Sequence, residues 1–329
     1  MPVSKADVRN GFRFILGREP ENNLTVLKYM LYPTLESFRV HLLRSKEFQS
    51  KHRAMGLEVQ AHPAASRYRP ATVFIHLQKT GGMTFHALLA RRFEQDRVFQ
   101  APQNMLHLLS IAELGWFDLF SGHFDYASTK FIQRPNVCAL SFFREPRQRL
   151  VSFYRFMRSH PLADEFQDSR SVELAHSLSA EEFFEHDEVR AAPEVFNHYL
   201  LTFGLSSYDI EQARPLNEKL ITSQIMERAE QNVRALAGIG ITERFDESVT
   251  VLFNLLGFRA PRRIVSRHVT DRMGKTDKRF SQVEPVAMTP RLLEAMDELV
   301  RFDREIYEIA VSEYERRRNL DGLAASARA

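Results

Sequence analysis

Residues 72–93 read TVFIHLQKTGGMTFHALLARRF, and this stretch decides the fold class. It opens with a β-branched and aromatic run at residues 72–77, which is typical of a short buried strand. Gly81 and Gly82 interrupt the run, and apolar residues then recur at helical spacing over residues 83–93. The stretch therefore predicts a strand, a glycine turn and a helix.

The same pattern returns at residues 137–158, VCALSFFREPRQRLVSFYRFMR. Residues 137–143 predict a second buried strand, and Pro146 favours a helix that starts directly after the turn. Two such units indicate an α/β core with a largely parallel sheet. Beyond residue 170 the pattern is mostly helical.

The rest of the chain divides by composition. Residues 1–60 show helical periodicity and no strand signal, so they predict a small helical module. Residues 61–70 have the proline-containing, small-residue composition of a linker. The main domain is expected to span residues 71–318 and to end in one long amphipathic helix from a Thr289 cap. Residues 319–329 are expected to be a disordered tail.

Overall composition is that of a folded globular protein. The 329 residues are 44% hydrophobic and 26% charged, which argues against wholesale disorder. The net charge of +3 suits anionic ligands without requiring nucleic acid. The one cysteine, Cys138, excludes an internal disulfide or a thiolate metal cluster and fits the cytoplasm. No uninterrupted apolar run approaches the length of a membrane span.

Residues 76–84, HLQKTGGMT, lie between the first predicted strand and its helix. Backbone N–H groups at such a junction favour a phosphate or sulfate, and glycines let them approach it closely. Lys79 adds a positive charge, and the Thr80 and Thr84 hydroxyls are candidate donors. Because a Walker-type loop has its lysine after the glycines, the order found here argues against a nucleotide kinase or an ordinary ATPase.

At this point the sequence resembles a known family. FIHLQKTGGMTF, residues 74–85, is similar to the 5′-phosphosulfate loop of the carbohydrate sulfotransferases that include the heparan sulfate 2-O and 6-O enzymes. LSFFREPRQRLVSFYRF, residues 140–156, resembles the family's 3′-phosphate element and aligns Arg144 and Ser152 with its arginine and serine. GIGITERFDESVTVLFNLLG, residues 238–257, resembles a further segment that follows the core.

The resemblance implies a P-loop-NTPase-like three-layer sandwich with a mostly parallel sheet, after a small all-α N-terminal domain. It implies transfer of a sulfuryl group from 3′-phosphoadenosine 5′-phosphosulfate to a hydroxyl of a saccharide or glycoconjugate, without a metal ion. Lys79 would stabilise the leaving phosphate. The cofactor would contact Lys79, Thr80, Gly81, Gly82, Met83, Thr84, Arg144 and Ser152. On the predicted helix, Ser152 is expected to face away from the apolar stripe.

His123 is the candidate catalytic base, because a neutral imidazole accepts a hydroxyl proton near pH 7. The Gly122–His123 step resembles a Gly–His step of the heparan sulfate 2-O enzymes. His76 and His86 are the alternatives, and Asp125 is a further candidate to orient or replace the base.

Two residues depart from the family pattern. Gln78 replaces the usual proline, which is expected to loosen the backbone that enters the loop, and Met83 replaces a hydroxyl residue. These changes keep open the alternative of a catalytically inactive protein that binds nucleotide or glycan. Arg267 and Lys275 are candidate contacts of cofactor or acceptor, or plain surface residues.

The N-terminal stretches ILGREPENNLTVLKYML, residues 15–31, and LLRSKEF, residues 42–48, resemble a small helical module found beside bacterial glycan-handling domains. The resemblance implies a bacterial source. It leaves open whether the module docks to a partner or glycan or caps the main domain.

Overall fold

The structure is a computed structural model. The residues it describes are 3–30, 32, 34–45, 47–48, 70–101, 103–132, 134, 136–162, 169–261, 264 and 280–326. The chain divides into two compact units between Tyr68 and Arg69. Across the described ranges, no helix has the combined length and apolarity needed to cross a bilayer.

The described part of the first unit is built from short helices around a core of its own. Ser4 begins the first of them with a capping box to Asp7, in which each residue's side chain bonds the other's backbone N–H. The helices are α1 (Lys5–Gly11), a π-helical turn (Phe12–Leu16), α2 (Asn23–Tyr29) and α3 (Leu35–Arg44). Their inner faces bury Val8, Phe12, Leu16, Val26, Phe38 and Leu42.

A parallel sheet forms the centre of the second unit. Its strands are β1 (Ala71–Ile75), β2 (Val98–Ala101), β3 (Leu119–Gly122), β4 (Val137–Phe143) and β5 (Gly238–Ile241). They lie in the order β2-β3-β1-β4-β5, and every adjacent pair is parallel. The predicted strands at residues 72–77 and 137–143 are confirmed as β1 and β4.

The helices of the second unit range from single turns to the long C-terminal helix. The α-helices are α5 (Gly82–Leu89), α6 (Ile111–Trp116), α7 (Pro146–Ser159), α8 (Ser169–Ser177), α9 (Ala180–Glu185), α10 (Asp187–Arg190), α11 (His198–Gly204), α12 (Ser207–Gln212), α13 (Ser223–Arg234), α14 (Phe245–Leu255), α16 (Pro290–Leu299) and α17 (Arg301–Ser326). Short 3₁₀ turns span Ala90–Arg92, Gln95–Arg97, Leu106–Leu108, Ala127–Phe131, Glu218–Leu220 and Thr242–Arg244.

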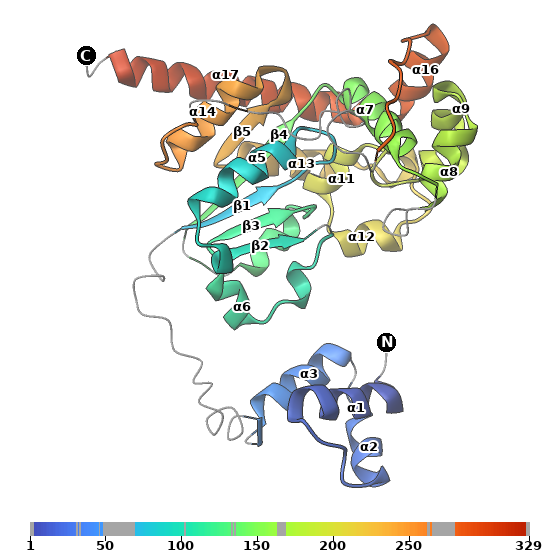
Figure 1. Cartoon of the computed structure of the whole chain (residues 1–329), viewed down its shortest axis with the longest axis vertical. Coiled ribbons are helices and arrows are strands. Elements are labelled where there is room, and N and C mark those ends of the chain that lie inside the picture. Colours follow the sequence, from blue (N-terminus) through green and yellow to red (C-terminus); the bar gives the residue numbers. More distant parts are fainter. Residues whose placement is uncertain are drawn as a thin grey trace. The chain divides into compact units, whose positions relative to one another are not determined.

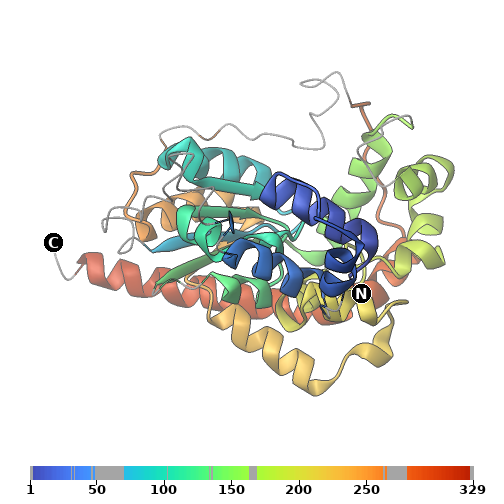
Figure 2. The same ribbon diagram turned by 90° about the horizontal axis from the view of Figure 1, so that it is seen from below.

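Helices cover both faces of the sheet, so the unit is a three-layer α/β sandwich. Because side chains alternate along a strand, Val73 of β1 packs toward α11, α13 and α17, whereas Phe74 packs toward α5 and α14. Figure 2 shows α17, in red, running along one side of the sheet. Helices α7, α8, α9 and α16 share a separate apolar cluster beside the sheet (Figure 1).

The C-terminal region differs from the sequence prediction. The expected single long helix is two helices, α16 and α17, which meet at Val300. The amide oxygen of Asn197 accepts hydrogen bonds from the N–H groups of Phe302 and Asp303, so a new helix begins there. The expected tail from residue 319 is also wrong up to Ser326, because α17 continues through it.

The strand order indicates which edge of the sheet is the candidate ligand-binding edge. From β1 the chain moves to one side, toward β2 and β3, and from β4 it moves to the other side, toward β5. Ligands of open parallel sheets bind in the crevice at the carboxyl ends of strands where the order reverses. The segments that leave β1 and β4 at this point contain Lys79 and Arg144.

Candidate anion-binding and catalytic site

The loop between β1 and α5 presents its backbone N–H groups together. Lys79 and Gly81 both have left-handed backbones, with φ of 65° and 82°. Gln78 and Lys79 form a tight turn, which directs the Thr80 N–H to the Leu77 carbonyl. Among the described residues, the N–H groups of residues 79, 81, 82 and 83 have no backbone acceptor. A run of such groups at the first turn of a helix is a concave site for an anion.

Gly82 lets the first turn of α5 lie against the ring of His76. A Cβ atom on Gly82 would come within 1.9 Å of Cδ2 of His76. We therefore expect Gly82→Ala to lower the free energy of unfolding by about 1–3 kcal/mol. Gly115→Ala is the matched control, because nothing lies within 4 Å of that Cβ position and Gly115 is also helical. Urea unfolding of both variants is the measurement. An equal change in the free energy of unfolding for the two variants would contradict the close contact between Gly82 and His76.

Thr80 makes hydrogen bonds through both its side chain and its backbone carbonyl. The side chain is fully buried, and its hydroxyl donates to the carbonyl of Leu77 at 2.8 Å. The hydroxyl of Thr242, just after β5, lies 2.7 Å from the carbonyl oxygen of Thr80 and 2.9 Å from that of Phe143. The Thr80 hydroxyl therefore fixes the turn instead of pointing to a ligand. The Thr84 side chain is buried as well, whereas Met83 is 42% exposed.

Lys79 is not a solvated loop lysine. Its side chain is half-buried, and Nζ lies 3.6 Å from the centre of the Phe156 ring. Burial, with the nearby positive charge of Arg144, lowers the pKa of Lys79 from 10.5 to about 7. A negative ligand in the loop would restore the ammonium form.

The lowered pKa of Lys79 predicts a specific pH dependence of stability. Between pH 7 and 10.5 the unfolded chain holds the Lys79 proton more tightly than the folded chain, so the cost of the buried ammonium falls as pH rises. We expect Lys79→Met to raise the free energy of unfolding most at pH 7 and below, and progressively less up to pH 10. Urea unfolding of both proteins across this range is the measurement, and a difference that does not change with pH would contradict the assignment.

Arg144 is the first residue after β4, and its side chain turns toward the loop. Nη1 donates to the carbonyl of Lys79 at 3.3 Å. Its backbone meets the hydroxyl of Tyr199, which accepts from the Arg144 N–H at 3.2 Å and donates to the Arg144 carbonyl at 2.8 Å. The structure therefore brings the two predicted basic residues, Arg144 and Lys79, to one place.

The helix after Arg144 places the other predicted residues differently. Glu145 caps α7, since its carboxylate accepts from the N–H groups of Arg147 and Gln148. The N-terminus of α7 is therefore already occupied by a negative group. Ser152 lies on the side of α7 away from the apolar stripe, as expected, and its surface is nevertheless only 8% exposed.

His123 lies directly after β3, beside the loop. Its Nδ1 is 2.6 Å from the carbonyl oxygen of His76. Because a carbonyl only accepts, Nδ1 carries the proton and Nε2 is the basic nitrogen. Burial and the charge of Lys79 lower the pKa of His123 below 6.5, so the ring is neutral at pH 7. This is the state that a general base requires.

The alternative bases are engaged elsewhere. The carboxylate of Asp125 is 4% exposed and accepts hydrogen bonds from Asn104, Ser128 and Ser207, so it fixes the surrounding loops. Nδ1 of His86 lies 2.9 Å from the hydroxyl of Ser121 inside the protein.

His76 is also a poor candidate for the base. Its ring is sandwiched between Phe74 and His123, with ring centres 5.4 and 4.6 Å away. Burial, with smaller effects of the neighbouring histidines and Lys79, holds the pKa of His76 well below 6.5. His76 therefore orients His123 through its carbonyl group.

The backbone of Gln78 makes a contact that the sequence did not predict. The Gln78 N–H donates to Nε2 of His198 at 3.4 Å, and Nδ1 of His198 donates to the carbonyl of Pro193 at 3.0 Å. Burial keeps the pKa of His198 well below 6.5, so the ring stays neutral and Nε2 can accept. A proline at position 78 has no N–H and could not make this bond. Gln78 therefore ties the loop to α11.

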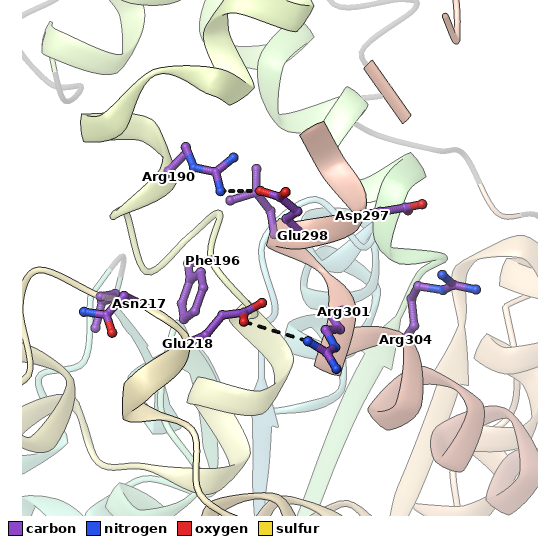
Figure 3. A pocket seen from close by; sticks show the side chains of 10 residues that line it. Arg190, Phe196, Asn217, Glu218, Asp297, Glu298, Arg301 and Arg304 are labelled. Atoms are coloured by element: carbon purple, nitrogen blue, oxygen red, sulfur yellow. Dashed lines mark hydrogen bonds and ion pairs between the residues drawn. The ribbon is translucent and has the colours of Figure 1, made fainter. Parts of the chain in front are cut away.

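The second unit has a small cavity at the candidate site and a larger one away from it. One of about 210 Å³ opens beside His123 and is also lined by His76, Gln78, His198 and Thr202. The other, of about 700 Å³, lies at the corner between α16 and α17 and does not include the loop. Figure 3 shows two ion pairs among its lining side chains, Arg190–Glu298 at 2.6 Å and Arg301–Glu218 at 3.8 Å. The smaller cavity is the one next to the candidate base.

Sequence reasoning missed three residues of this site: Phe156, His198 and Tyr199. Phe156 ends the stretch 140–156 but has no assigned role in it, and His198 and Tyr199 lie in a helical, apolar stretch without a motif, so these positions come from tertiary packing. Arg267 and Lys275 lie outside the described residues. In the described ranges, no group of three or more histidine, cysteine or carboxylate side chains is arranged to hold a metal ion.

No family model matches the chain, and no curated protein matches it.

Proposed function

We propose that the protein is a sulfotransferase that moves a sulfuryl group from 3′-phosphoadenosine 5′-phosphosulfate to a hydroxyl of a saccharide or glycoconjugate. The observation that carries the proposal is the loop of residues 79–83, where most backbone N–H groups have no backbone acceptor among the described residues and Arg144 lies against Lys79. The strand order and the placement of this loop after β1 support a P-loop-NTPase-like sheet.

Each residue of the site has a separate role in the proposed reaction. The backbone N–H groups hold the 5′-phosphosulfate, and the Arg144 guanidinium suits the 3′-phosphate because its planar fork binds two oxygens at once. The acceptor hydroxyl enters the cavity of about 210 Å³ and loses its proton to Nε2 of His123. An S–O bond to the acceptor forms while the S–O bond to the 5′-phosphate breaks.

Lys79 stabilises the charge that this displacement releases. The leaving group is adenosine 3′,5′-bisphosphate, and negative charge grows on its 5′-phosphate as the S–O bond lengthens. An ammonium group in a buried setting stabilises such charge more strongly than one in water. The half-buried Lys79 next to the loop N–H groups meets this requirement. The residues described here provide for the transfer through positioning and electrostatics alone.

The test is transfer of a ³⁵S-labelled sulfuryl group from the nucleotide to a panel of neutral and acidic oligosaccharides. We expect label in at least one acceptor with the unaltered chain, and none above background with Lys79→Ala or His123→Ala. Bisphosphate binding without transfer to any acceptor would favour the second candidate, an inactive nucleotide- or glycan-binding protein. Absence of both binding and transfer would overturn the proposal.

We also propose that the first unit is a small helical module that contacts a partner or glycan. Its own buried core of Val8, Phe12 and Phe38 supports an independent fold.

A further inference from the structure

Tyr199 bonds both backbone polar groups of Arg144, which lies between β4 and α7. Its phenol hydroxyl accepts from the Arg144 N–H at 3.2 Å and donates to the Arg144 carbonyl at 2.8 Å. The far ends of the same two peptide groups are bound as well, the Phe143 carbonyl by Thr242 at 2.9 Å and the Glu145 N–H by Glu243 at 2.8 Å. No motif in the sequence points to this tyrosine.

The backbone of Arg144 matters because a long side chain magnifies any rotation at its base. A planar guanidinium binds two anion oxygens only within a narrow range of orientations. The same guanidinium donates to the carbonyl of Lys79 at 3.3 Å, so its position also bears on the left-handed turn of the loop. Tyr199 is thus bonded directly to the Arg144 backbone and linked through the Arg144 guanidinium to the backbone of Lys79.

Tyr199 is itself held rigidly. Its side chain is fully buried, and its ring meets that of Phe143 edge-on at 5.3 Å. Its backbone N–H donates to Oδ1 of the buried Asp303 at 2.8 Å, and the guanidinium of Arg149 lies 5.6 Å from the ring centre. Because these contacts restrict the movement of the ring, the hydroxyl keeps a fixed position relative to the backbone of Arg144.

We infer that Tyr199 is a positioning residue that holds Arg144 in the orientation required to bind the 3′-phosphate of the nucleotide. This inference rests on the proposed function. The hydroxyl acts through Arg144 and does not touch the ligand.

The test compares Tyr199→Phe with Tyr154→Phe. Tyr154 is a matched control because it is also buried, donates to a carbonyl, that of Leu178 at 3.0 Å, and accepts from Arg158 at 2.7 Å. We expect similar losses of stability in urea for the two variants. We expect only Tyr199→Phe to raise the Kd for adenosine 3′,5′-bisphosphate, by about three- to tenfold. Equal affinities in both variants would overturn the inference.

A double-mutant cycle separates positioning from a general structural effect. If Tyr199 acts through Arg144, then Tyr199→Phe should not change the remaining affinity in an Arg144→Ala background. An equal additional loss in that background would show that Tyr199 acts by another route and would overturn the inference.

A crystal structure of Tyr199→Phe without ligand provides a readout that does not depend on nucleotide binding. We expect the peptide groups on both sides of Arg144 to be displaced relative to the unaltered protein. If the unaltered protein binds no bisphosphate, the proposed function fails. The comparison of the two backbones at Arg144 then still tests whether Tyr199 positions Arg144. An unchanged backbone would overturn the inference.

Discussion

His123→Ala is expected to lower the rate of sulfuryl transfer by about 10²- to 10⁴-fold, the usual contribution of a positioned general base. The physical reason is the fixed tautomer of His123. Nδ1 donates its proton to the carbonyl of His76, so Nε2 is free of a proton and can take one from the hydroxyl of the acceptor saccharide. Affinity for adenosine 3′,5′-bisphosphate should change little, because the imidazole takes the proton of the acceptor. Steady-state kinetics with the labelled nucleotide give the rate.

The control for this prediction is His107→Ala, which removes an exposed histidine. It should leave turnover unchanged. The pH profile adds a second check, since kcat/KM of the unaltered enzyme should fall at acidic pH as His123 is protonated, and this limb should be absent from the variant. If the variant retained the acidic limb and the full rate, another group would be the base.

Lys79→Ala is expected to lower kcat by about 10²- to 10³-fold, as for loss of one preorganised group that stabilises transition-state charge. The half-buried ammonium lies beside the N–H groups proposed to hold the phosphosulfate, so its removal is expected to leave the 5′-phosphate of the leaving group less well stabilised. Binding of the bisphosphate should weaken less than kcat falls, because charge on the bridging oxygen grows mainly in the transition state. Single-turnover kinetics separate the two quantities.

Lys130→Ala is the matched control for Lys79. Lys130 also lies over an aromatic ring, with Nζ 4.8 Å from the centre of Tyr126, but it is exposed and away from the loop. This substitution removes a charge and a cation–π contact of the same type. Similar kcat values for Lys79→Ala and the unaltered enzyme would refute the role given to Lys79.

The sequence predicted the parts of the fold that carry strong local signals. β1 and β4 are buried runs of β-branched and aromatic residues, and Pro146 marks the start of α7. β2, β3 and β5 have four residues each, which is too short for alternation to stand out from the neighbouring sequence. β5, GIGI, is half glycine, a residue type that strands disfavour, so its position depends on pairing with β4.

The candidate site was predicted in outline, and its supporting contacts were not. Lys79, His123 and Arg144 follow strand ends, so a parallel sheet brings them to one edge whatever the details of packing. The bond from Gln78 to His198 joins residues 120 positions apart, and that from Arg144 to Tyr199 spans 55 positions. No local pattern encodes such contacts. The helix break at Val300 has the same origin, because Asn197 caps α17 from a distant part of the chain.

Ser152 shows the limit of helical periodicity as a guide to exposure. Periodicity places Ser152 correctly opposite Leu150 and Tyr154, but it does not predict what covers the other face. The helix packs against several segments that come much later in the chain, among them the one at Val283, whose carbonyl accepts from Arg155 at 2.9 Å. A residue outside the apolar stripe is therefore buried.

The most direct test of the central claim is thermal unfolding of the protein with adenosine 3′,5′-bisphosphate, ATP and ADP, for the unaltered chain and for Arg144→Ala. A ligand at about 100 times its Kd adds about 2.7 kcal/mol to the stability of the folded state. The account predicts a stabilisation that is selective for the bisphosphate and is lost in Arg144→Ala. Equal stabilisation by ATP and the bisphosphate, or none by the bisphosphate, would contradict it.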